Sequence, residues 1–495
     1  MRTEYVLSID QGTTGTTVLL MDTKGEIVGK ESREFTQYYP QPGWVEHDAI
    51  EIWQVTCQVI TDLVSTYNAQ DQVIAIGVTN QRETTIIWDR RTGNPIHPAI
   101  VWQCRRTSEI CSDLKQRGLE GKIKSKTGLV TDPYFSATKI SWILDQVDNA
   151  RSLANHGHLA FGTIDSWLLW NLTDGTSHAT DQTNASRTML FNINTLKWDE
   201  ELLKIFQVPV SILPEVKPSS QIFGTTKGLE FLPDSIPISG MAGDQQAALF
   251  GQLCTQPGVA KNTYGTGCFL LLNTGDQPIQ SESGLLTTLA CSLDQTPTYA
   301  LEGSVFIAGA VIQWLRDELR FVDSAAETEG LAESLNDSDG VVVVPAFTGL
   351  GAPYWDPDAK GAILGLTRGT TPSHIVRASL ESIAFQSADL VEAMVSDAGF
   401  QLGQLRVDGG ATSNNFLMQF QADLLGVDVV RPRHIETTAI GAAYLAGLGV
   451  GLWKNINELE SHRQVDRVFS SQMSESRRQD KLSAWRHAVK RVLSS

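Results

Sequence analysis

Acidic and hydroxyl groups follow the first apolar run of this chain, residues 5–9. Asp10 comes directly after that run, and a Gln-Gly-Thr-Thr-Gly turn occupies residues 11–15. Glycines let several backbone N–H groups point at one spot, and threonine hydroxyls add uncharged donors, so this turn suits phosphate oxygens. Asp10 would then offer the hard oxygen ligand that a magnesium ion on those phosphates needs. An ordinary glycine-threonine hairpin turn is the alternative.

Arg82 and Glu83 form a second candidate group, shortly after the apolar run 72–78. Ligands in α/β proteins bind beyond the carboxyl ends of buried strands. An arginine placed there can fork onto hydroxyl oxygens, and a glutamate can accept their protons. An exposed ion pair in a loop is the alternative interpretation of these two residues.

Asp244 is the third candidate, at the end of the glycine-rich run 236–243. Small neighbours would let a substrate approach its carboxylate closely. An aspartate that caps a helix N-terminus explains the same pattern. Two aromatic residues, Trp102 and Tyr134, lie beside polar groups in the sequence. For both of them, a core role and a ligand-binding role remain open.

A second strand-turn-strand pattern, at residues 259–272, repeats the opening theme with Thr266 and Gly267 at its tip. Two such hairpins about 250 residues apart predict duplicated domains that face one polyphosphate from opposite sides. We therefore expect two domains, residues 1–252 and residues 253–495.

The second half also contains a candidate site for an adenine ring. Gly409 and Gly410 follow the predicted strand 404–408 and expose flat backbone without a Cβ atom. A helix of small residues at 438–447 is expected to close this site. The hairpins would hold the nucleotide in place of a P-loop, because the sequence has no Walker A motif.

The elements expected in the first half follow a recognisable order. Periodicity predicts strands at residues 5–9, 16–21, 26–30 and 72–78, with a helix at 48–67 before the last strand. This order is one half of an actin-like or ribonuclease-H-like α/β domain. With the second hairpin, the predicted fold is α/β, with two such domains flanking a central catalytic cleft.

Composition limits the classes of partner. The chain has 39 Lys and Arg against 56 Asp and Glu, a formal net charge of −17, which disfavours binding to nucleic acid. The six cysteines are scattered and predict neither disulfides nor a zinc site. We expect a cytoplasmic protein without a membrane anchor, because the N-terminus leaves no room for a signal peptide and no apolar run is long enough to span a bilayer.

Seven segments of the chain form a recognisable set. They are DQGTT (10–14), TNQRETT (79–85), WQCRR (102–106), AGDQQAALFGQ (242–252), KNTYGTGCF (261–269), FTGLGAPYWDP (347–357) and VDGGA (407–411). Together they resemble the glycerol kinases of the FGGY carbohydrate kinase family. Residues 134–146 and 361–381 fit two broader signatures of the same family. The resemblance covers nearly the whole chain and implies transfer of a phosphoryl group from ATP to glycerol, with Mg²⁺ present.

The resemblance also implies roles for individual residues. The polyol hydroxyls would be bound by Arg82, Glu83, Tyr134 and Asp244 with Gln245 beside them, and the carbon chain would lie between Trp102 and Phe269. The nucleotide would be bound by Thr13, Thr14, Gly15, Thr266, Gly267, Gly309, Gln313, Gly410, Ala411 and Asn414. Asp10 and Asp244 would position Mg²⁺, and Asp244 would be the general base. Family analogy favours a homodimer or homotetramer.

The chain departs from the family pattern after its first turn. The family commonly has a Ser-x-Arg arrangement whose arginine contacts nucleotide phosphates, whereas this chain has Gly15, Thr16 and Thr17. Residues 225–235 also lack the Gly-Arg loop through which some bacterial members bind fructose 1,6-bisphosphate, and they contain no histidine for a phosphorylation switch.

Two other functions fit parts of the pattern. One is a related kinase for a longer sugar or polyol, which the bulky Trp102 and Phe269 disfavour. The other is an ATP switch on the actin or heat-shock scaffold. Such a switch would have no use for Arg82, Glu83 and Asp244 converging between its domains.

Overall fold

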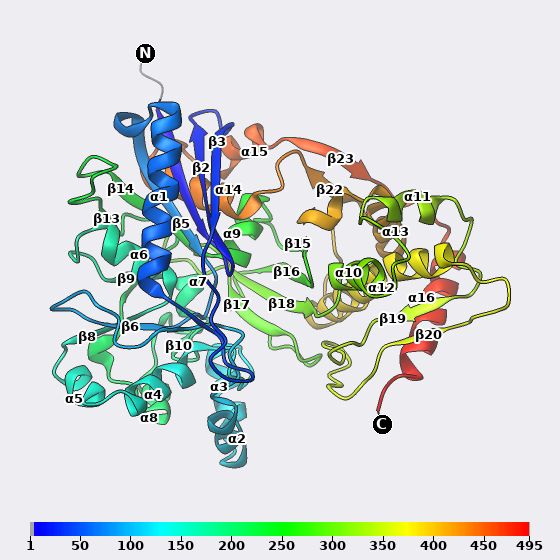
Figure 1. Ribbon diagram of the computed structural model, residues 1–495, viewed down its shortest axis with the longest axis horizontal. Helices are drawn as coiled ribbons and strands as arrows, with labels where there is room; N and C mark the ends of the chain where they lie inside the picture. The colour runs from blue at the N-terminus through cyan, green and yellow to red at the C-terminus, as the bar shows by residue number, and fades with distance from the viewer. Residues whose placement is uncertain (1–3, 495) are drawn as a thin grey trace.

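The computed structural model describes residues 4–494 and contains two bodies, each built around a mixed sheet (Figure 1). In spatial order the first sheet contains β13 (Gly224–Thr225), β14 (Pro237–Gly243), β5 (Val73–Asn80), β1 (Tyr5–Gln11), β2 (Gly15–Asp22) and β3 (Ile27–Glu34). The second contains β17 (Leu286–Leu289), β18 (Tyr299–Val305), β16 (Cys268–Gly275), β15 (Val259–Tyr264), β21 (Gln404–Asp408), β22 (Val429–Pro432) and β23 (Val465–Phe469).

Shorter strands pair outside these sheets. They are β4 (Glu46–His47) with β7 (Ala99–Ile100), β6 (Ile86–Asp89) with β8 (Leu159–Gly162), β10 (Phe191–Asn192) with β11 (Lys197–Trp198), β12 (Glu215–Lys217) with β9 (Ala179–Asp181), and β19 (Val342–Val344) with β20 (Ala362–Leu364).

Sixteen helices surround the strands in the described part of the chain. They are α1 (Ala49–Tyr67), α2 (Ser108–Gln116), α3 (Glu120–Thr127), α4 (Ser136–Gln146), α5 (Ala150–Asn155), α6 (Ile164–Leu172), α7 (Gln182–Ala185), α8 (Glu200–Phe206), α9 (Asp244–Gly251), α10 (Gly309–Asp317), α11 (Glu327–Glu333), α12 (Pro372–Ala398), α13 (Asn415–Leu425), α14 (Thr437–Gly449), α15 (Ile456–His462) and α16 (Glu475–Lys490).

The two sheets repeat one topology. In the first, β1, β2 and β3 form an antiparallel meander, and β5 and β14 continue the sheet parallel to β1. In the second, β15, β16 and β18 form the meander, and β21 and β22 continue it parallel to β15. This repeat confirms the predicted α/β fold of two actin-like halves.

Local sequence explains how α1 begins, ends and packs. Asp48 caps its N-terminus by accepting hydrogen bonds from the amides of Ile50 and Glu51. The helix ends at Asn68, which adopts a left-handed conformation with φ of 51°. Its buried apolar face, which includes Ile52 and Val59, packs on one side of the first sheet.

Helix α14 joins the two bodies. Its first residue, Thr437, donates a hydrogen bond to Asp408, which precedes the predicted nucleotide site. The rest of the helix packs against β1, β5 and β14 and against α9, so a segment late in the chain covers the second face of the first sheet. Glycine makes the contact close, since a Cβ atom at Gly77 would lie 2.1 Å from the carbonyl oxygen of Ala442. The physical reason is that α14 is apolar on all sides, and such a helix is stable only when surrounded.

The C-terminal helix is docked on the second body. Leu482, Trp485 and Val489 of α16 are buried in the core of that body. Within residues 4–494, no helix has both the length and the apolar character to cross a membrane.

Candidate active site

Three parallel strands deliver the candidate residues to one edge of the first sheet. Asp10 of β1 pairs with Thr79 of β5, which in turn pairs with Ala242 of β14. Arg82 and Glu83 follow β5, and Asp244 begins α9 directly after β14. Because the carboxyl ends of adjacent parallel strands meet, residues far apart in sequence come together there.

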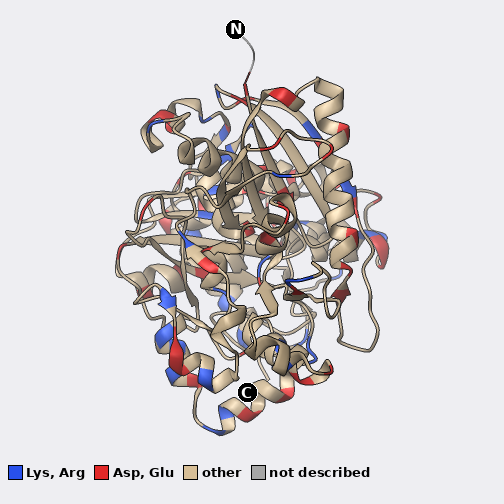
Figure 2. Cartoon of the chain, turned by 90° about the vertical axis from the view of Figure 1, so that its left-hand side faces the viewer, with Lys and Arg blue, Asp and Glu red and all other residues tan. Residues whose placement is uncertain are grey.

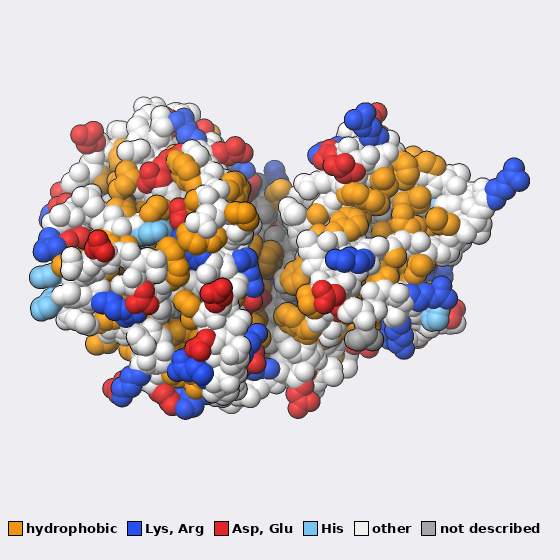
Figure 3. Space-filling view, turned by 60° about the horizontal axis from the view of Figure 1, so that its bottom comes forward, with side chains coloured by type: hydrophobic (Ala, Val, Ile, Leu, Met, Phe, Trp, Pro, Cys, Tyr) orange, Lys and Arg blue, Asp and Glu red, His pale blue; other side chains and the backbone are white. Residues whose placement is uncertain are grey.

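The space-filling view shows a groove between the two bodies (Figure 3). Arg82 of the first body contacts Glu302 of the second body where the bodies meet. Figure 2 shows acidic and basic residues interspersed over the face that it presents. With a net charge of −17, the chain has no general attraction for phosphates. A polyphosphate in the groove must therefore be held by local groups.

Arg82 and Glu83 are buried, which excludes an exposed loop ion pair. Arg82 Nε lies 3.1 Å from Asp244 Oδ1 and 3.8 Å from Glu83 Oε1. Glu83 has a φ of 61°, a left-handed conformation that is costly for a residue other than glycine. Its carbonyl oxygen accepts hydrogen bonds from Ser136 Oγ at 3.1 Å and Lys139 Nζ at 3.2 Å, which helps to hold this turn.

Asp244 is the first residue of α9 and does not cap it, since the capping position is Gly243. Its Oδ1 accepts a hydrogen bond of 2.6 Å from the amide of Gln245 as well as contacting Arg82. Its Oδ2 has no hydrogen-bond partner among residues 4–494, and the side chain is 30% exposed. One oxygen is therefore fixed by the protein, and the other is available to a ligand.

Sequence reasoning missed two members of this cluster, Arg187 and Glu302. Arg187 Nε lies 2.6 Å from Glu83 Oε1, and Arg187 Nη2 lies 3.0 Å from Glu302 Oε1. Glu302 also contacts Arg82 through Nη1 at 2.6 Å and Nη2 at 2.9 Å. A sequence signal existed for Glu302, because it is a lone charge within the apolar strand YALEGSV. A buried charge of this kind needs a partner elsewhere.

Burial and charge act in opposite directions on these carboxyl groups. Burial raises the pKa of Asp244 above its ordinary value, although Arg82 and Lys261 oppose the rise. Burial would also raise the pKa of Glu302, but Arg187 and Arg82 together hold it at about 2. Glu302 is therefore ionised at neutral pH.

The surroundings of Asp10 disfavour its charged form unless a cation is nearby. Burial and the nearby charge of Asp244 raise its pKa to about 8. No group of three or more His, Cys, Asp and Glu that could hold a metal occurs in the described chain. Two carboxylates fit magnesium, which keeps several water ligands and takes only one or two from protein.

Hydrogen bonds within the protein hold the first predicted phosphate turn, residues 11–15, in place. The amide of Gly12 donates to the carbonyl of Gly15 at 2.9 Å. Gln81 Nε2 donates to the carbonyl of Gly12 at 3.1 Å, and Gln37 Nε2 to that of Thr13 at 3.1 Å. Thr14, at the tip, is exposed.

Thr17 of β2 lies beside this turn, where the family pattern has arginine. It pairs with Asp10 across the hairpin, and its hydroxyl lies 2.9 Å from that of Ser32 on β3. Neither of these two neighbours of Thr17, Asp10 and Ser32, supplies the positive charge of the family arginine.

The second predicted phosphate turn, residues 265–267, is hydrogen-bonded to the start of α10. The amide of Gly265 donates to the carbonyl of Gly267, and the amide of Gly309 donates to that of Gly265, each at 2.9 Å. Gly309 needs to be glycine, because a Cβ atom there would lie 2.6 Å from the carbonyl oxygen of Gly265. Thr266 is exposed at the tip, and Gln313 is exposed one turn along α10.

The predicted adenine surface lies at the end of β21, which is adjacent to β15. Gly410 and Ala411 belong to a short 3-10 helix, Gly410–Ser413, and Gly410 is exposed. Asn414 caps α13 by accepting from the amide of Leu417 at 2.9 Å. The side-chain oxygen of Asn414 is therefore already engaged as a helix cap.

The remaining predicted substrate residues line the groove from both bodies. The rings of Trp102 and Tyr134 meet edge to face with centroids 5.5 Å apart. The Tyr134 hydroxyl lies 3.4 Å from Arg82 Nη2, and Trp102 Nε1 donates to Thr13 Oγ1 at 3.0 Å. Both rings therefore lie beside other predicted site residues, Arg82 and Thr13.

Gln245 and Phe269 are placed differently from the other polyol residues. The side-chain oxygen of Gln245 accepts a hydrogen bond from Lys261 of the second body. Phe269 is half-buried on β16 and pairs with Ser304 of β18. The structure thus gives Gln245 a partner within the protein.

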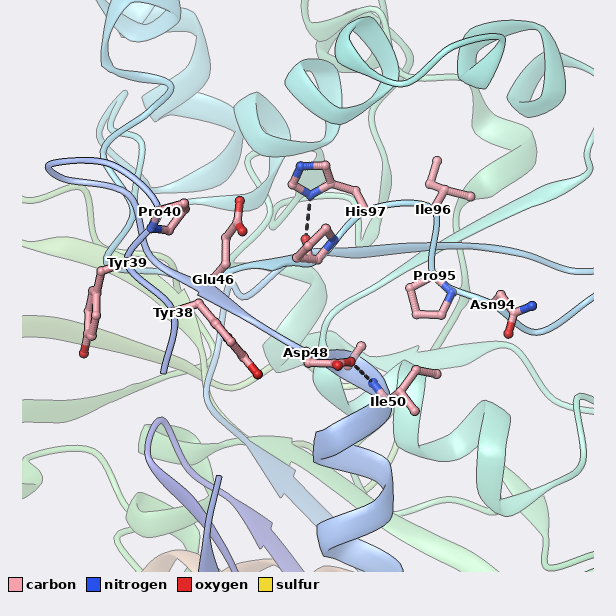
Figure 4. Close-up of a pocket in the computed structure, with 12 residues that line it drawn as sticks. Tyr38, Tyr39, Pro40, Glu46, Asp48, Ile50, Asn94, Pro95, Ile96 and His97 are labelled. Atoms are coloured by element: carbon pink, nitrogen blue, oxygen red, sulfur yellow. Dashed lines mark hydrogen bonds between the residues drawn. The ribbon is translucent and has the colours of Figure 1, made fainter. Parts of the chain in front are cut away.

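A separate surface pocket of about 870 Å³ contains none of the predicted site residues (Figure 4). Three of its polar side chains have partners within the protein. Asp48 accepts from the amide of Ile50, Glu46 lies 2.7 Å from Arg106 Nη2, and His97 Nδ1 lies 2.7 Å from the carbonyl of Pro98. The close-up shows the contacts of Asp48 and His97 as dashed lines (Figure 4).

Comparison with known proteins agrees with this geometry. The models of the N-terminal and C-terminal domains of the FGGY family of carbohydrate kinases match residues 5–251 and 260–450. A glycerol kinase of Alkaliphilus metalliredigens is 58% identical over 99% of this chain and 98% of its own length. A glycerol kinase of Petrotoga mobilis is 59% identical, with the same coverage of 99% and 98%.

A solved structure extends the comparison to the fold. The crystal structure of Plasmodium falciparum glycerol kinase with ADP has a TM-score of 0.95 at 41% identity, and covers 100% of this chain and 99% of that one. Sequence, topology and the groove between two repeated sheets agree: this chain belongs to the FGGY family of carbohydrate kinases.

Proposed function

We propose that this chain is an enzyme that transfers the γ-phosphoryl group of ATP to a terminal hydroxyl of glycerol, forming sn-glycerol 3-phosphate. The observation that carries the proposal is the buried pair of Arg82 Nε and Asp244 Oδ1, 3.1 Å apart, with Glu83 and the Tyr134 hydroxyl beside them. These groups offer hydrogen-bond donors and acceptors for a small polyol, between two turns that suit phosphates.

Asp244 acts as the general base in this proposal. A primary hydroxyl attacks poorly until it is aligned and its proton has an acceptor, and Asp244 Oδ2 is free to accept it. The hydroxyl then attacks the γ-phosphorus in line with the departing ADP oxygen. Closure of the two bodies would align the groups and exclude water, so most of the rate acceleration is positional.

Mg²⁺ is the proposed metal, held by Asp10 and Asp244. When bound, it would neutralise charge on the β- and γ-phosphate oxygens. The residues proposed to bind the phosphates are Thr13, Thr14, Gly15, Thr266 and Gly267. The residues proposed for the rest of the nucleotide are Gly309, Gln313, Gly410, Ala411 and Asn414.

The polyol is proposed to lie between Trp102 and Phe269, with Arg82, Glu83, Tyr134, Asp244 and Gln245 bonding its hydroxyls. Gln245 would need to exchange its hydrogen bond from Lys261 for one to the polyol. A three-carbon acceptor fits two large side chains better than a longer sugar does.

We also propose two domains, residues 1–252 and 253–495, and a homodimer or homotetramer in the cytoplasm. The ranges of the two family models support a boundary between residues 251 and 260. Because α14 of the second range packs on the first sheet, the two ranges are not independent folding units.

An acceptor panel tests the reaction. Purified protein with Mg-ATP is offered glycerol, dihydroxyacetone, xylulose, gluconate or no acceptor, and ADP release is measured. We expect strong turnover with glycerol, little with the larger compounds and little without an acceptor. Preference for xylulose or gluconate would indicate a longer-substrate kinase, and turnover that is indifferent to acceptor would indicate an ATP switch.

A further inference from the structure

Glu302 brings the second body into the polyol site of the first. It lies on β18, where it pairs with Leu271 of β16. Its carboxylate crosses the groove and accepts from Arg82 Nη1 at 2.6 Å and Nη2 at 2.9 Å. Both side chains are buried, so solvent does not weaken this two-point contact.

The two contacts with Glu302 leave Nε of Arg82 to face Asp244. With Nη1 and Nη2 both directed at Glu302, the guanidinium plane is fixed, and Nε lies 3.1 Å from Asp244 Oδ1. A guanidinium is rigid and planar, so fixing one edge also fixes the other. Glu302 therefore determines which edge of Arg82 meets Asp244.

The same carboxylate reaches Glu83 through Arg187. Arg187 Nη2 donates to Glu302 Oε1 at 3.0 Å, and Arg187 Nε donates to Glu83 Oε1 at 2.6 Å. The Arg187 guanidinium also lies over the rings of Tyr134 and Phe135, 5.7 and 5.3 Å from their centroids. Three of the proposed polyol-binding residues, Arg82, Glu83 and Tyr134, thus depend on one carboxylate and its arginine.

We infer that Glu302 is a positioning residue for the polyol: it orients Arg82 directly and Glu83 through Arg187, and so makes polyol binding depend on the second body. The inference rests on the proposed function. It predicts that Glu302 affects the affinity for the polyol without touching the polyol itself. The second body, which carries the other predicted phosphate turn, would thereby influence polyol binding.

Loss of the Glu302 charge frees both arginines. In Glu302→Gln the side chain keeps its shape but can accept from only one oxygen, so Arg82 and Arg187 have only Glu83 and Asp244 as carboxylate partners. Arg82 would then turn its Nη groups toward Asp244. These groups would occupy the Asp244 carboxylate oxygen that is proposed to accept from the polyol hydroxyl. We expect KM for glycerol to rise by about 10- to 100-fold.

If the contacts of Glu302 only held the two bodies together, the substitution would have a different effect. It would lower thermal stability and the folded fraction, but KM does not depend on how much of the protein is folded. The test therefore measures KM for glycerol and KM for ATP in wild type, Glu302→Gln and Glu302→Asp. We expect KM for ATP to stay within about twofold, because Glu302 contacts neither phosphate turn.

The aspartate variant separates charge from reach. It keeps the negative charge but is one methylene shorter, so we expect its KM for glycerol to lie between those of wild type and Glu302→Gln. Wild-type KM values in both variants would overturn the inference, as would equal rises in KM for glycerol and for ATP.

Asp389→Asn is the matched control. Asp389 is a buried carboxylate of the second body that accepts from Tyr354 OH at 2.7 Å and Trp485 Nε1 at 2.6 Å, away from the groove residues. We expect it to lower the melting temperature and leave both KM values unchanged. A glycerol-specific rise in KM in this control as well would overturn the inference.

A binding measurement separates failure of this inference from failure of the proposed function. Glycerol without ATP should raise the melting temperature of wild type and raise that of Glu302→Gln much less at the same concentration. Equal shifts in both proteins would overturn the positioning role alone. Absence of both a shift and turnover in wild type would instead remove the proposed function.

Discussion

The two carboxylate oxygens of Asp244 are in different environments. Oδ1 accepts from the Gln245 amide at 2.6 Å and contacts Arg82 Nε at 3.1 Å. Oδ2 has no hydrogen-bond partner within the described chain. The first oxygen holds the group in place, and the second can take a proton without breaking a contact.

Asp244→Asn should lower turnover by at least about two orders of magnitude, because an amide cannot accept the proton of the attacking hydroxyl. At about 1.4 kcal/mol per factor of ten, this is about 3 kcal/mol of transition-state stabilisation. Steady-state kcat measures the loss, and titration with a non-hydrolysable ATP analogue should show affinity close to wild type. Near-normal turnover would reject Asp244 as the base.

The site could be predicted from sequence where a residue follows a strand end. Asp10, Arg82 and Asp244 were recognisable because glycine and apolar runs frame them. Arg187 and Glu302 were not, because their partners lie 104 and 220 residues away. A pairing of that kind depends on how the two sheets meet, which local patterns do not encode.

Strand β4 supports the first phosphate turn through a buried histidine. His47 Nε2 lies 2.7 Å from Gln37 Oε1, and His47 Nδ1 lies 3.4 Å from Gln81 Nε2. These two glutamines hold the carbonyl oxygens of Thr13 and Gly12. Burial lowers the pKa of His47 from 6.5 to about 4, so the ring is neutral at pH 7.

The free energy of unfolding should therefore fall as pH drops from about 6.5 toward 4. In this window the unfolded chain protonates His47 and the folded chain does not, so the contribution is full above pH 6.5 and is lost toward pH 4. The slope from this group is at most about 1.4 kcal/mol per pH unit. Urea unfolding at several pH values should show a smaller slope for His47→Gln; equal slopes would contradict the assignment.

Helix α14 meets α9 through glycine, and this contact leaves no space for a side chain. A Cβ atom at Gly441 would lie 1.9 Å from the carbonyl oxygen of Ala247. Backbone cannot move away as a flexible side chain can. The two helices are therefore held at a distance that only glycine permits.

Gly441→Ala should lower the free energy of unfolding by about 1–3 kcal/mol, the usual cost of overpacking. Gly330→Ala in α11 is the matched control, because that Cβ atom meets nothing within 4 Å and alanine favours helix. Denaturant midpoints measure both variants. A stable Gly441→Ala would show that α14 can move away from α9.

Individual elements were predictable where periodicity is strong. The strands β1, β2, β3 and β5 and helix α1 formed near the expected residues. Apolar runs mark the buried strands β1, β2 and β5, and an apolar face of helical period marks α1. The packing of α14 was not predictable in the same way. Its apolar surface specifies that it is buried and does not specify by which sheet.

The whole molecule leaves large apolar side chains exposed on the second body. Phe347 is 40% exposed, Trp355 50% and Leu366 58%. Figure 3 shows a broad apolar area on this body, on the right of the view. A contiguous exposed apolar area is typical of an interface.

We expect the protein to be a homodimer or homotetramer in solution, with this area in the interface. Light scattering after gel filtration should give two or four times the 54.2 kDa of one chain. Leu366→Asp should reduce that mass, because a charge in an apolar interface is costly. Thr92→Asp, in an exposed loop of the first body, is the control and should not reduce it. A monomeric wild type would contradict the expectation.

The position of α14 has a consequence for synthesis on the ribosome. When residues 1–252 have emerged, all strands of the first sheet exist, but the helix that covers its second face is encoded almost two hundred residues later. Apolar residues on that face, such as Val6 and Leu19, must remain uncovered until Gly449 has left the exit tunnel. The nascent first body thus exposes apolar surface while most of the second body is translated.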